Sequence, residues 1–206
     1  MVFWDQIVDV LRESMLAYAQ VCNGNLGYGI LIVTFLARLA LLPLGLRLAR
    51  LAQAHQQAMQ KIQPELDALR RTYQRNPRRL AEETRRVMAR AGVSPLSAAG
   101  GIGLIQFPIF LALYAAVRQV AGIGGRFLWV RDISKPEAIV AALATLFTVA
   151  AAASGSSGSA PNRSIMLILS AVVTAVALSK MAAGIGLYWG LSSLFGAVQG
   201  LVIQRR

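Results

Sequence analysis

Residues 31–45 read LIVTFLARLALLPLG, an almost continuous run of Leu, Ile, Val, Phe and Ala with Arg38 in its middle. Such a run is typical of a helix that lies in lipid. An arginine at the centre of a bilayer costs roughly 2.5–3.5 kcal/mol on insertion scales, and it is tolerated where it faces water. We therefore expect a transmembrane helix in which Arg38 faces a wet cavity. Thr34, four residues earlier, falls on the same helix face.

The rest of the chain predicts an all-α membrane protein with a single domain over residues 1–206. Hydrophobic residues make up 56% of the chain and the mean hydropathy is +0.54, which is more apolar than a typical soluble domain. Several stretches approach the ~20 apolar residues that are needed to cross a bilayer. Five transmembrane helices are predicted, over residues 26–46, 99–118, 137–154, 164–181 and 182–203.

The distribution of basic residues predicts the orientation of these spans. The net charge is +12, and eleven Lys and Arg residues lie within residues 47–90. Because cytoplasmic loops are enriched in basic residues, this segment is expected on the inner side. The N-terminus then lies outside and the C-terminus inside the bacterial cytoplasmic (inner) membrane. A smaller basic loop with Arg118, Arg126, Arg131 and Lys135 falls outside in this topology, and the larger segment outweighs it.

Residues 48–92 are predicted to form a cytoplasmic antiparallel helical hairpin. Apolar residues recur there at three- and four-residue steps, and RNP at 75–77 is a turn signal between two helices. Pro64 is expected to kink the first helix or to divide it in two. The arginines are mostly a solvated face, which can attract anionic head groups and a ribosome's RNA surface. The candidate contacts are Arg70, Arg71, Arg75, Arg78, Arg79, Arg85 and Arg86.

Two segments are predicted at the outer membrane interface. One is the loop with Phe127, Leu128 and Trp129. The other is an amphipathic helix over residues 2–20, whose apolar stripe has two possible placements. It lies on the membrane surface, or it packs on the protein's own loops. The stripe comprises Trp4, Ile7, Val8, Leu11 and Met15.

The residue types present argue against catalysis. The only histidine, His55, lies in the polar segment, and no Asp or Glu lies within a predicted span. A nucleophile–histidine pair, a histidine metal site and a carboxylate proton relay therefore lack their groups. No glycine-rich phosphate loop is present, and the single cysteine, Cys22, forms no disulfide within the chain. We predict no catalytic residue, no metal and no cofactor, and therefore a protein that is not an enzyme.

Polar side chains on the other spans are candidates for the walls of the cavity. They have two interpretations: they line one wet cavity with Arg38, or they bond their own backbone and join helices. The lack of an intramembrane acid that could neutralise Arg38 favours the cavity for that residue. Beside Arg38 and Thr34, the candidates are Gln106, Thr145, Thr148, Ser192 and Ser193.

The order of the motifs resembles the YidC family of membrane-protein insertases. The chain contains, in sequence, NGNLGYGILIVTFLARLALLPLGLRLARLAQAHQQAMQKIQPELDALRRTYQRNP, GVSPLSAAGGIGLIQFPIFLALYAAV, FLWVRDIS and GIGLYWGLSSLFGAVQGLVI. The resemblance implies a hydrophilic groove that is open to the cytoplasm and to lipid, with Arg38 as its positive charge and Thr34 beside it. It also implies that Tyr188 and Trp189 lie on a helix that borders the substrate path.

The resemblance further implies a function and partners. The function is the insertion and chaperoning of nascent membrane proteins without nucleotide hydrolysis, amid membrane lipids and without sequence-specific nucleic acid binding. The ribosome, the signal recognition particle receptor and the Sec translocon are implied partners. The sequence resembles a short form, without the large outer domain of some bacterial members. It departs from the family at Ser94, where Asn usually precedes the proline, and in having AGGIG in place of Gly-Cys-Leu-Pro.

Two other functions remain open from the residues alone. Arg38 also suits the anion site of a small channel or transporter, which would require a continuous pore. The chain also suits a non-catalytic scaffold for the assembly of membrane complexes, a role that is compatible with insertion.

Overall fold

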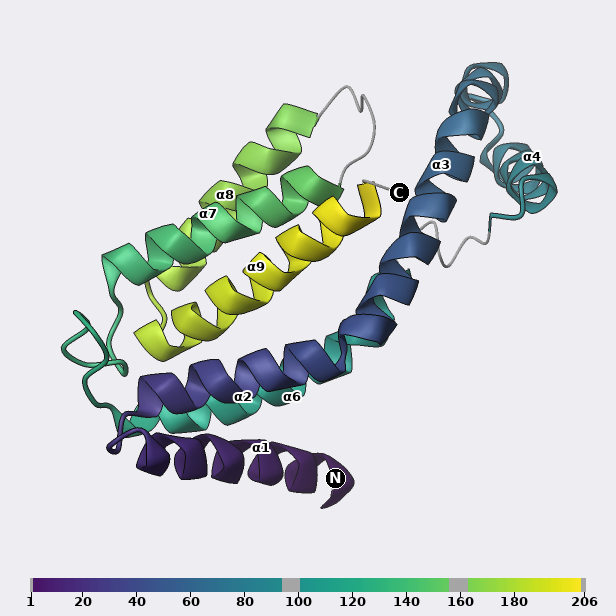
Figure 1. Ribbon diagram of the computed structural model, residues 1–206. Coiled ribbons are helices and arrows are strands. Elements are labelled where there is room, and N and C mark those ends of the chain that lie inside the picture. The colour runs from purple at the N-terminus through teal and green to yellow at the C-terminus, as the bar shows by residue number, and fades with distance from the viewer. Residues whose placement is uncertain (1, 94–100, 156–162, 205–206) are drawn as a thin grey trace. The chain divides into compact units, whose positions relative to one another are not determined.

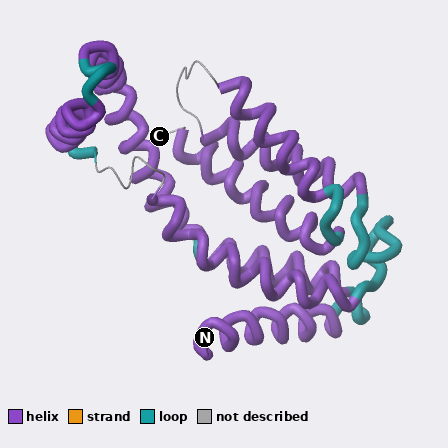
Figure 2. The backbone as a smooth tube through the Cα atoms, turned by 180° about the vertical axis from the view of Figure 1, so that it is seen from behind, coloured by secondary structure: helices purple, strands orange, loops and turns teal. Residues whose placement is uncertain are grey.

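The computed structural model describes residues 2–93, 101–155 and 163–204, and the regular structure in these ranges is helical. Figures 1 and 2 show helices joined by loops, with no strand in the described ranges. The predicted all-α class is confirmed for this part of the chain. The helices are α1 (Val2–Val21), α2 (Leu26–Ala40), α3 (Leu42–Thr72), α4 (Pro77–Arg90), α6 (Gly101–Ile123), α7 (Ala138–Gly155), α8 (Arg163–Leu178) and α9 (Ala183–Gln204).

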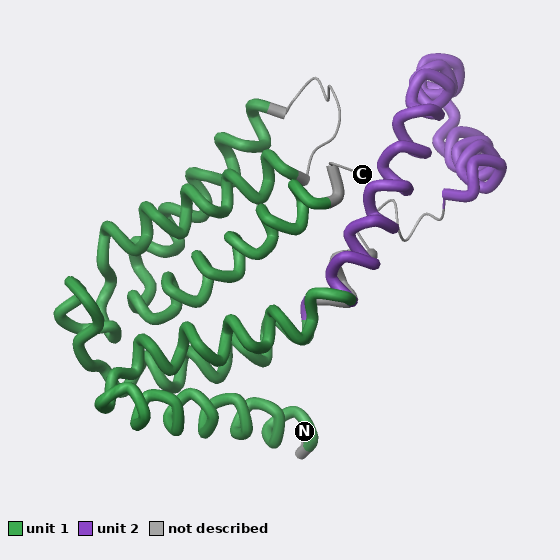
Figure 3. The backbone as a smooth tube through the Cα atoms, viewed as in Figure 1, with its two compact units in different colours: residues 1–43, 108–206 green, residues 44–107 purple. Residues whose placement is uncertain are grey.

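The chain forms two compact units, which Figure 3 distinguishes by colour. Unit 1 comprises residues 1–43 and 108–206, and unit 2 comprises residues 44–107. Unit 1 therefore holds α1, α2, α7, α8, α9 and most of α6. Unit 2 holds α4 and most of α3, and so contains the segment that was predicted to form the helical hairpin.

The first predicted span is not one uninterrupted helix. Its start is set by Asn25, whose side chain accepts a hydrogen bond from the Gly27 amide at 3.1 Å and so caps α2. The predicted span over residues 26–46 breaks after Ala40, and α3 begins at Leu42. Pro43 explains the break, because it has no N–H to continue the hydrogen bonds of α2 but fits the first turn of a new helix.

The core of unit 1 draws on segments that are far apart in the sequence. Its fully buried side chains include Met15 of α1, Ile30 of α2, Val117 of α6 and Tyr188 of α9. Ile133, from the loop between α6 and α7, is also fully buried in it. Val140 of α7 also belongs to this core. The core therefore joins the N-terminal helix, four of the apolar helices and one loop into a single packed body.

Helix α1 packs along α2 with the apolar stripe that the sequence predicted. Val8 and Met15 are buried in the core of unit 1, whereas Trp4 at the start of the stripe is 39% exposed. The stripe thus packs on the protein's own helices, rather than on loops. Other large apolar side chains of α1 remain exposed, and they are Phe3, Val10, Tyr18 and Val21.

Gly29 sets the close approach of α1 and α2. A Cβ at this position would collide with the Met15 carbonyl, which is backbone and cannot rotate away. We expect Gly29→Ala to lower the free energy of unfolding by about 1–3 kcal/mol, the usual cost of overpacking. Thermal unfolding in detergent measures the change. Gly122→Ala in α6 is the matched control, because a Cβ there meets nothing within 4 Å; equal melting temperatures for the two variants would contradict this packing.

Small residues also bring α7 and α9 together. A Cβ at Gly186 would lie 2.7 Å from the Val140 side chain, and a Cβ at Gly190 would lie 3.4 Å from Ala144. Small residues allow such close contacts between membrane helices, where there is little hydrophobic force between the helices themselves. Helix α8, in contrast, keeps an apolar surface exposed, as expected for a helix that faces lipid. Its exposed large side chains are Ile165, Met166, Ile168, Leu169, Val172, Val173 and Val176.

The number of membrane spans stays a prediction. Within the described ranges, α9 is the one helix that is long and apolar enough to cross a bilayer, over Ala183–Val202. A second candidate arises if α2 and the start of α3 form one broken span. The remaining apolar helices, over Phe107–Ile123, Ala138–Ser154 and Ser164–Leu178, are shorter than that test requires.

The loop between α6 and α7 packs on the end of unit 1. Phe127 is 2% exposed and its ring meets that of Tyr28 edge-on, with centroids 5.1 Å apart. The sequence placed Phe127 at the membrane interface, and this was wrong, because Gly27 leaves a space on α2 that the Phe127 ring fills. Leu128 and Trp129, at 62% and 51% exposed, do face outward.

The same loop is tied to α9 through its backbone. The Ile133 carbonyl accepts a hydrogen bond from the Gly184 amide at 3.0 Å, and the Lys135 carbonyl accepts one from the Ala183 amide at 2.9 Å. These amides belong to the first turn of α9 and have no partner within the helix. The loop therefore supplies hydrogen-bond acceptors to the N-terminus of the helix that is long and apolar enough to cross a bilayer.

Asp132 holds the turn of this loop. Its Oδ1 accepts hydrogen bonds from the Ser134 hydroxyl at 2.7 Å and from the Ser134 amide at 3.0 Å. These bonds, helped by the nearby charge of Lys135, lower the pKa of Asp132 below its usual value of 3.8. A lowered pKa means that the carboxylate stabilises the loop at neutral pH, and that this contribution is lost as the pH falls through the lowered pKa.

Unit 2 contains two helices joined by a turn. Helix α3 runs through Pro64 without a break, so division of the first arm was wrong. Pro64 itself is exposed, so its ring lies on the solvent side of α3. Asn76 caps α4 by accepting a hydrogen bond from the Arg79 amide at 3.2 Å, next to Pro77 in the first turn. The antiparallel packing of the two arms stays a prediction.

Candidate functional site

Arg38 lies near the C-terminal end of α2 and is half-buried in unit 1. Its Nε donates a hydrogen bond to the Ser192 hydroxyl of α9 at 3.2 Å. None of the ion pairs in the described part of the chain includes Arg38. The acids of unit 1 lie on α1 and around the loop before α7, at Asp5, Asp9, Glu13, Asp132 and Glu137. The guanidinium is therefore a positive charge held by a neutral hydroxyl.

Tyr188 extends the polar group around Arg38. It lies one turn before Ser192 on α9 and is fully buried, and its hydroxyl donates to the Phe110 carbonyl of α6 at 3.1 Å. The Arg38 guanidinium and the Ser192 hydroxyl both interact with the Tyr188 hydroxyl. These four residues, Arg38, Phe110, Tyr188 and Ser192, form what we call the arginine cluster. It joins α2, α6 and α9 through polar contacts inside an apolar body.

Thr34 lies one turn before Arg38 and is fully buried. Its hydroxyl has no hydrogen-bond partner in the described part of the chain. A buried hydroxyl without a partner loses its contacts with water, which usually costs about 1–3 kcal/mol. Thr34 thus places an unused polar atom on the helix that carries Arg38.

A second polar group lies between α7 and α9. The Trp189 indole N–H donates to the Thr148 hydroxyl at 3.1 Å, and the hydroxyls of Thr148 and Ser193 are 3.0 Å apart. Thr148 also donates to the Ala144 carbonyl of its own helix at 2.8 Å. One of its bonds is therefore to its own backbone, as one interpretation predicted, and the others join two helices. We call Thr148, Trp189 and Ser193 the tryptophan cluster.

The ring of Phe110 contacts both clusters. It packs against Tyr188 with centroids 5.5 Å apart and edge-on against Trp189 with centroids 5.4 Å apart. The residues predicted to line one cavity thus separate into two groups on neighbouring faces of α9. Sequence reasoning missed Phe110, because its polar contribution is a backbone carbonyl, and no side-chain pattern reveals which carbonyl accepts a second bond.

Besides Thr34, two predicted cavity residues join neither cluster through a described contact. The Thr145 hydroxyl donates to the Ala141 carbonyl of its own helix at 2.7 Å, as expected for a polar side chain that bonds its own backbone. Gln106 lies in α6, and its side chain is outside the described part of the structure. Ser94, a position where the sequence departs from the family pattern, also lies outside the described residues.

The candidate arginines of unit 2 are all exposed. Arg70 pairs with Asp67 at 3.1 Å, and Arg86 pairs with Glu82 and Glu83 at 2.7 Å each. The other candidates form no ion pair within the described residues, so they are free to meet an anionic partner. These are Arg71, Arg75, Arg78, Arg79 and Arg85.

Comparison with known proteins identifies relatives over nearly the whole chain. The family model for the 60Kd inner membrane protein matches residues 17–206. The chain is 32% identical over 203 residues to the membrane protein insertase YidC 1 of Halalkalibacterium halodurans, covering 95% of this chain and 77% of that protein. It is 30% identical to the membrane protein insertase MisCA of Bacillus subtilis, over 98% of this chain and 79% of that one. The resemblance in the motifs is confirmed, and the chain belongs to the 60Kd inner membrane protein family.

Proposed function

We propose that this protein is a membrane-protein insertase of the bacterial inner membrane that works without nucleotide hydrolysis. The observation that carries the proposal is Arg38, a half-buried cation with no acidic partner among the described residues. A charge kept inside an apolar body is costly, and it is typical of a functional site in membrane proteins. Membership of the same family as the YidC and MisCA insertases supports the same conclusion.

The proposed mechanism shortens the apolar distance that a polar tail must cross. Arg38 faces a groove that admits water from the cytoplasm, and it attracts acidic residues in the tail of a nascent protein. The membrane potential helps to pull such a tail outward. The apolar helix that follows then leaves sideways along α7 and α9 into lipid, driven by burial of its apolar surface at roughly 25 cal/mol per Å².

The proposed topology has five spans, with the N-terminus outside and the C-terminus inside. The exposed apolar side chains of α1 lie in the outer interface, while its opposite stripe packs on α2. Unit 2 forms a cytoplasmic hairpin whose free arginines meet the ribosome, the signal recognition particle receptor or the Sec translocon. The number of unpaired arginines on unit 2 supports an anionic partner.

Water access at position 38 tests the groove. In a Cys22→Ser background, single cysteines at positions 38 and 192 are labelled in vesicles of known orientation with a membrane-impermeant maleimide. We expect labelling at 38 and 192 from the cytoplasmic side only. Leu169→Cys on α8 is the control, because that side chain is 59% exposed and is expected to face lipid. Labelling of position 38 from the outer side, or no labelling, would contradict a groove that opens to the cytoplasm.

Crosslinking to nascent chains and anion flux distinguish an insertase from a channel. Photo-crosslinkers at Leu143 of α7 and Leu194 of α9, which are 40% and 39% exposed, should capture nascent membrane proteins if substrates leave along these helices. A channel should instead pass anions through vesicles that contain the purified protein. Anion flux without crosslinking would overturn the proposed function.

A further inference from the structure

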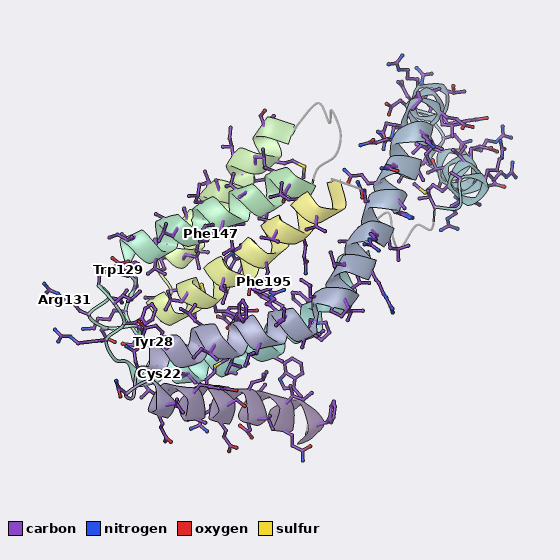
Figure 4. All side chains as sticks on the ribbon, in the orientation of Figure 1. Cys22, Tyr28, Trp129, Arg131, Phe147 and Phe195 are labelled. Carbon is purple, nitrogen blue, oxygen red and sulfur yellow. The ribbon has the colours of Figure 1, made fainter. Side chains whose placement is uncertain are left out.

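Two cavities of unit 1 share Trp129 as a wall. The first has a volume of ≈ 170 Å³ and lies between α7 and α9, with Leu31 of α2 as a further wall. The second has a volume of ≈ 380 Å³ and lies in the loop before α7. Figure 4 labels one residue from each cavity and the residue that they share: Arg131 lines the second cavity, Phe147 of α7 lines the first, and Trp129 lines both. An apolar space and a polar space therefore adjoin at one indole ring.

The first cavity suits a single hydrocarbon chain. Its walls are apolar, and they include Gly186 and Gly190, the positions where α9 packs closely on α7. From Gly186 to Leu194 the lining follows α9 for ~12 Å of helix axis. Leu143 and Leu194 line the cavity and are 40% and 39% exposed, so the space is accessible from the side. An α-helix is about 10–12 Å across with its side chains, too wide for this volume.

The second cavity carries charges of both signs. Its walls include Arg131 and Lys135, and also Asp132 and Glu137. Lys135 lies 3.9 Å from Asp132 and its side chain is 78% exposed, so this pair is loose and the ammonium is available. Each carboxylate is already fixed in place: Asp132 by Ser134, and Glu137 by accepting a hydrogen bond from the Val140 amide at 2.8 Å. The charges are therefore held at defined positions around one space.

We propose that the two cavities together bind one phospholipid with a zwitterionic head group that ends in a primary ammonium. Arg131 and Lys135 bind the phosphate, and Asp132 and Glu137 accept hydrogen bonds from the ammonium. One acyl chain passes Trp129 and fills the groove between α7 and α9. The indole lies at the level of the head groups, where tryptophan is enriched in membrane proteins. This site is separate from the arginine cluster and does not depend on the insertase function.

Native mass spectrometry of the full chain in detergent tests the proposal. The probes are phosphatidylethanolamine, phosphatidylcholine and phosphatidylglycerol with identical acyl chains. We expect one phosphatidylethanolamine molecule per chain, retained about tenfold more tightly than phosphatidylglycerol and more tightly than phosphatidylcholine, whose quaternary ammonium donates no hydrogen bond. Equal retention of the three lipids would mean non-specific annular binding and would overturn the proposal.

Matched variants separate the two halves of the site. Arg131→Glu with Lys135→Glu removes the phosphate contacts, and Leu143→Trp fills the groove; each should lower retention about tenfold. The controls are Arg126→Glu, in the same loop but outside the cavity lining, and Leu146→Trp, which lies on α7 and is 61% exposed. Loss of retention in Leu143→Trp alone would mean that the groove holds an acyl chain without contacts to the head group, and would overturn the proposed head-group site. Because no substrate is present, this assay is independent of insertion.

Discussion

Replacing Arg38 by alanine is expected to lower the insertion of a substrate with an acidic tail at least tenfold. The variant removes the cation at the centre of the arginine cluster, and Ser192 alone offers no charge to the tail. Two unit charges 4 Å apart interact by about 4 kcal/mol at an effective dielectric constant of 20, and a third of that energy corresponds to a factor of ten. Protease protection of the translocated tail measures insertion in cells depleted of their own insertase.

Three comparisons make this result specific to the charge in the groove. Arg38→Lys should keep most of the activity, because it keeps the positive charge. Arg118→Ala, at an exposed arginine of α6, should insert the same substrate as well as the unchanged protein. A substrate with a neutral tail should be affected much less by Arg38→Ala. If Arg38→Ala inserts the acidic substrate normally, the proposed electrostatic step is wrong.

Replacing Tyr188 by alanine is expected to destabilise unit 1 by about 3–5 kcal/mol, as for other large aromatic side chains in cores. Tyr188 is fully buried, its ring packs against that of Phe110, and its hydroxyl joins α9 to the backbone of α6. Tyr188→Phe keeps the ring and loses the hydrogen bond, so it should cost about 1 kcal/mol. Chemical unfolding in mixed micelles, followed by circular dichroism, gives both values.

Tyr18→Ala is the matched control for this prediction. Tyr18 lies on α1 and is 39% exposed, so its loss leaves no cavity in the core. We expect a change below about 0.5 kcal/mol, as for most surface substitutions. Similar losses of stability in Tyr18→Ala and Tyr188→Ala would contradict the burial of the Tyr188 ring.

The sequence was most informative where composition and periodicity carry the signal. The all-α class follows from long apolar runs, and the turn signal RNP at 75–77 coincides with the break between α3 and α4. Arg38 was identifiable as a functional candidate from a single charge in an apolar run. These features are local, so a short window of residues contains the information that decides them.

The pairing of side chains across helices was not predictable in the same way. Ser192 and Ser193 are neighbours in the sequence, yet one meets Arg38 of α2 and the other meets Thr148 of α7. Which face of α9 meets which helix depends on contacts between segments that are far apart in the sequence, with a separation of 154 residues for Arg38 and Ser192 and of 45 for Thr148 and Ser193. Phe127 was misplaced for the same reason, because its site is made by Gly27 on a distant helix.

The backbone bonds from Ala183 and Gly184 to the preceding loop have a mechanical consequence. Tilting α9 away from that loop would break two bonds at once, each worth about 0.5–1.5 kcal/mol. Helix α9 and the loop before α7 should therefore move together when the helix of a bound substrate pushes on α9. A displacement of α9 should therefore be smallest beside Ile133 and largest at the opposite end of the helix, near Gln204.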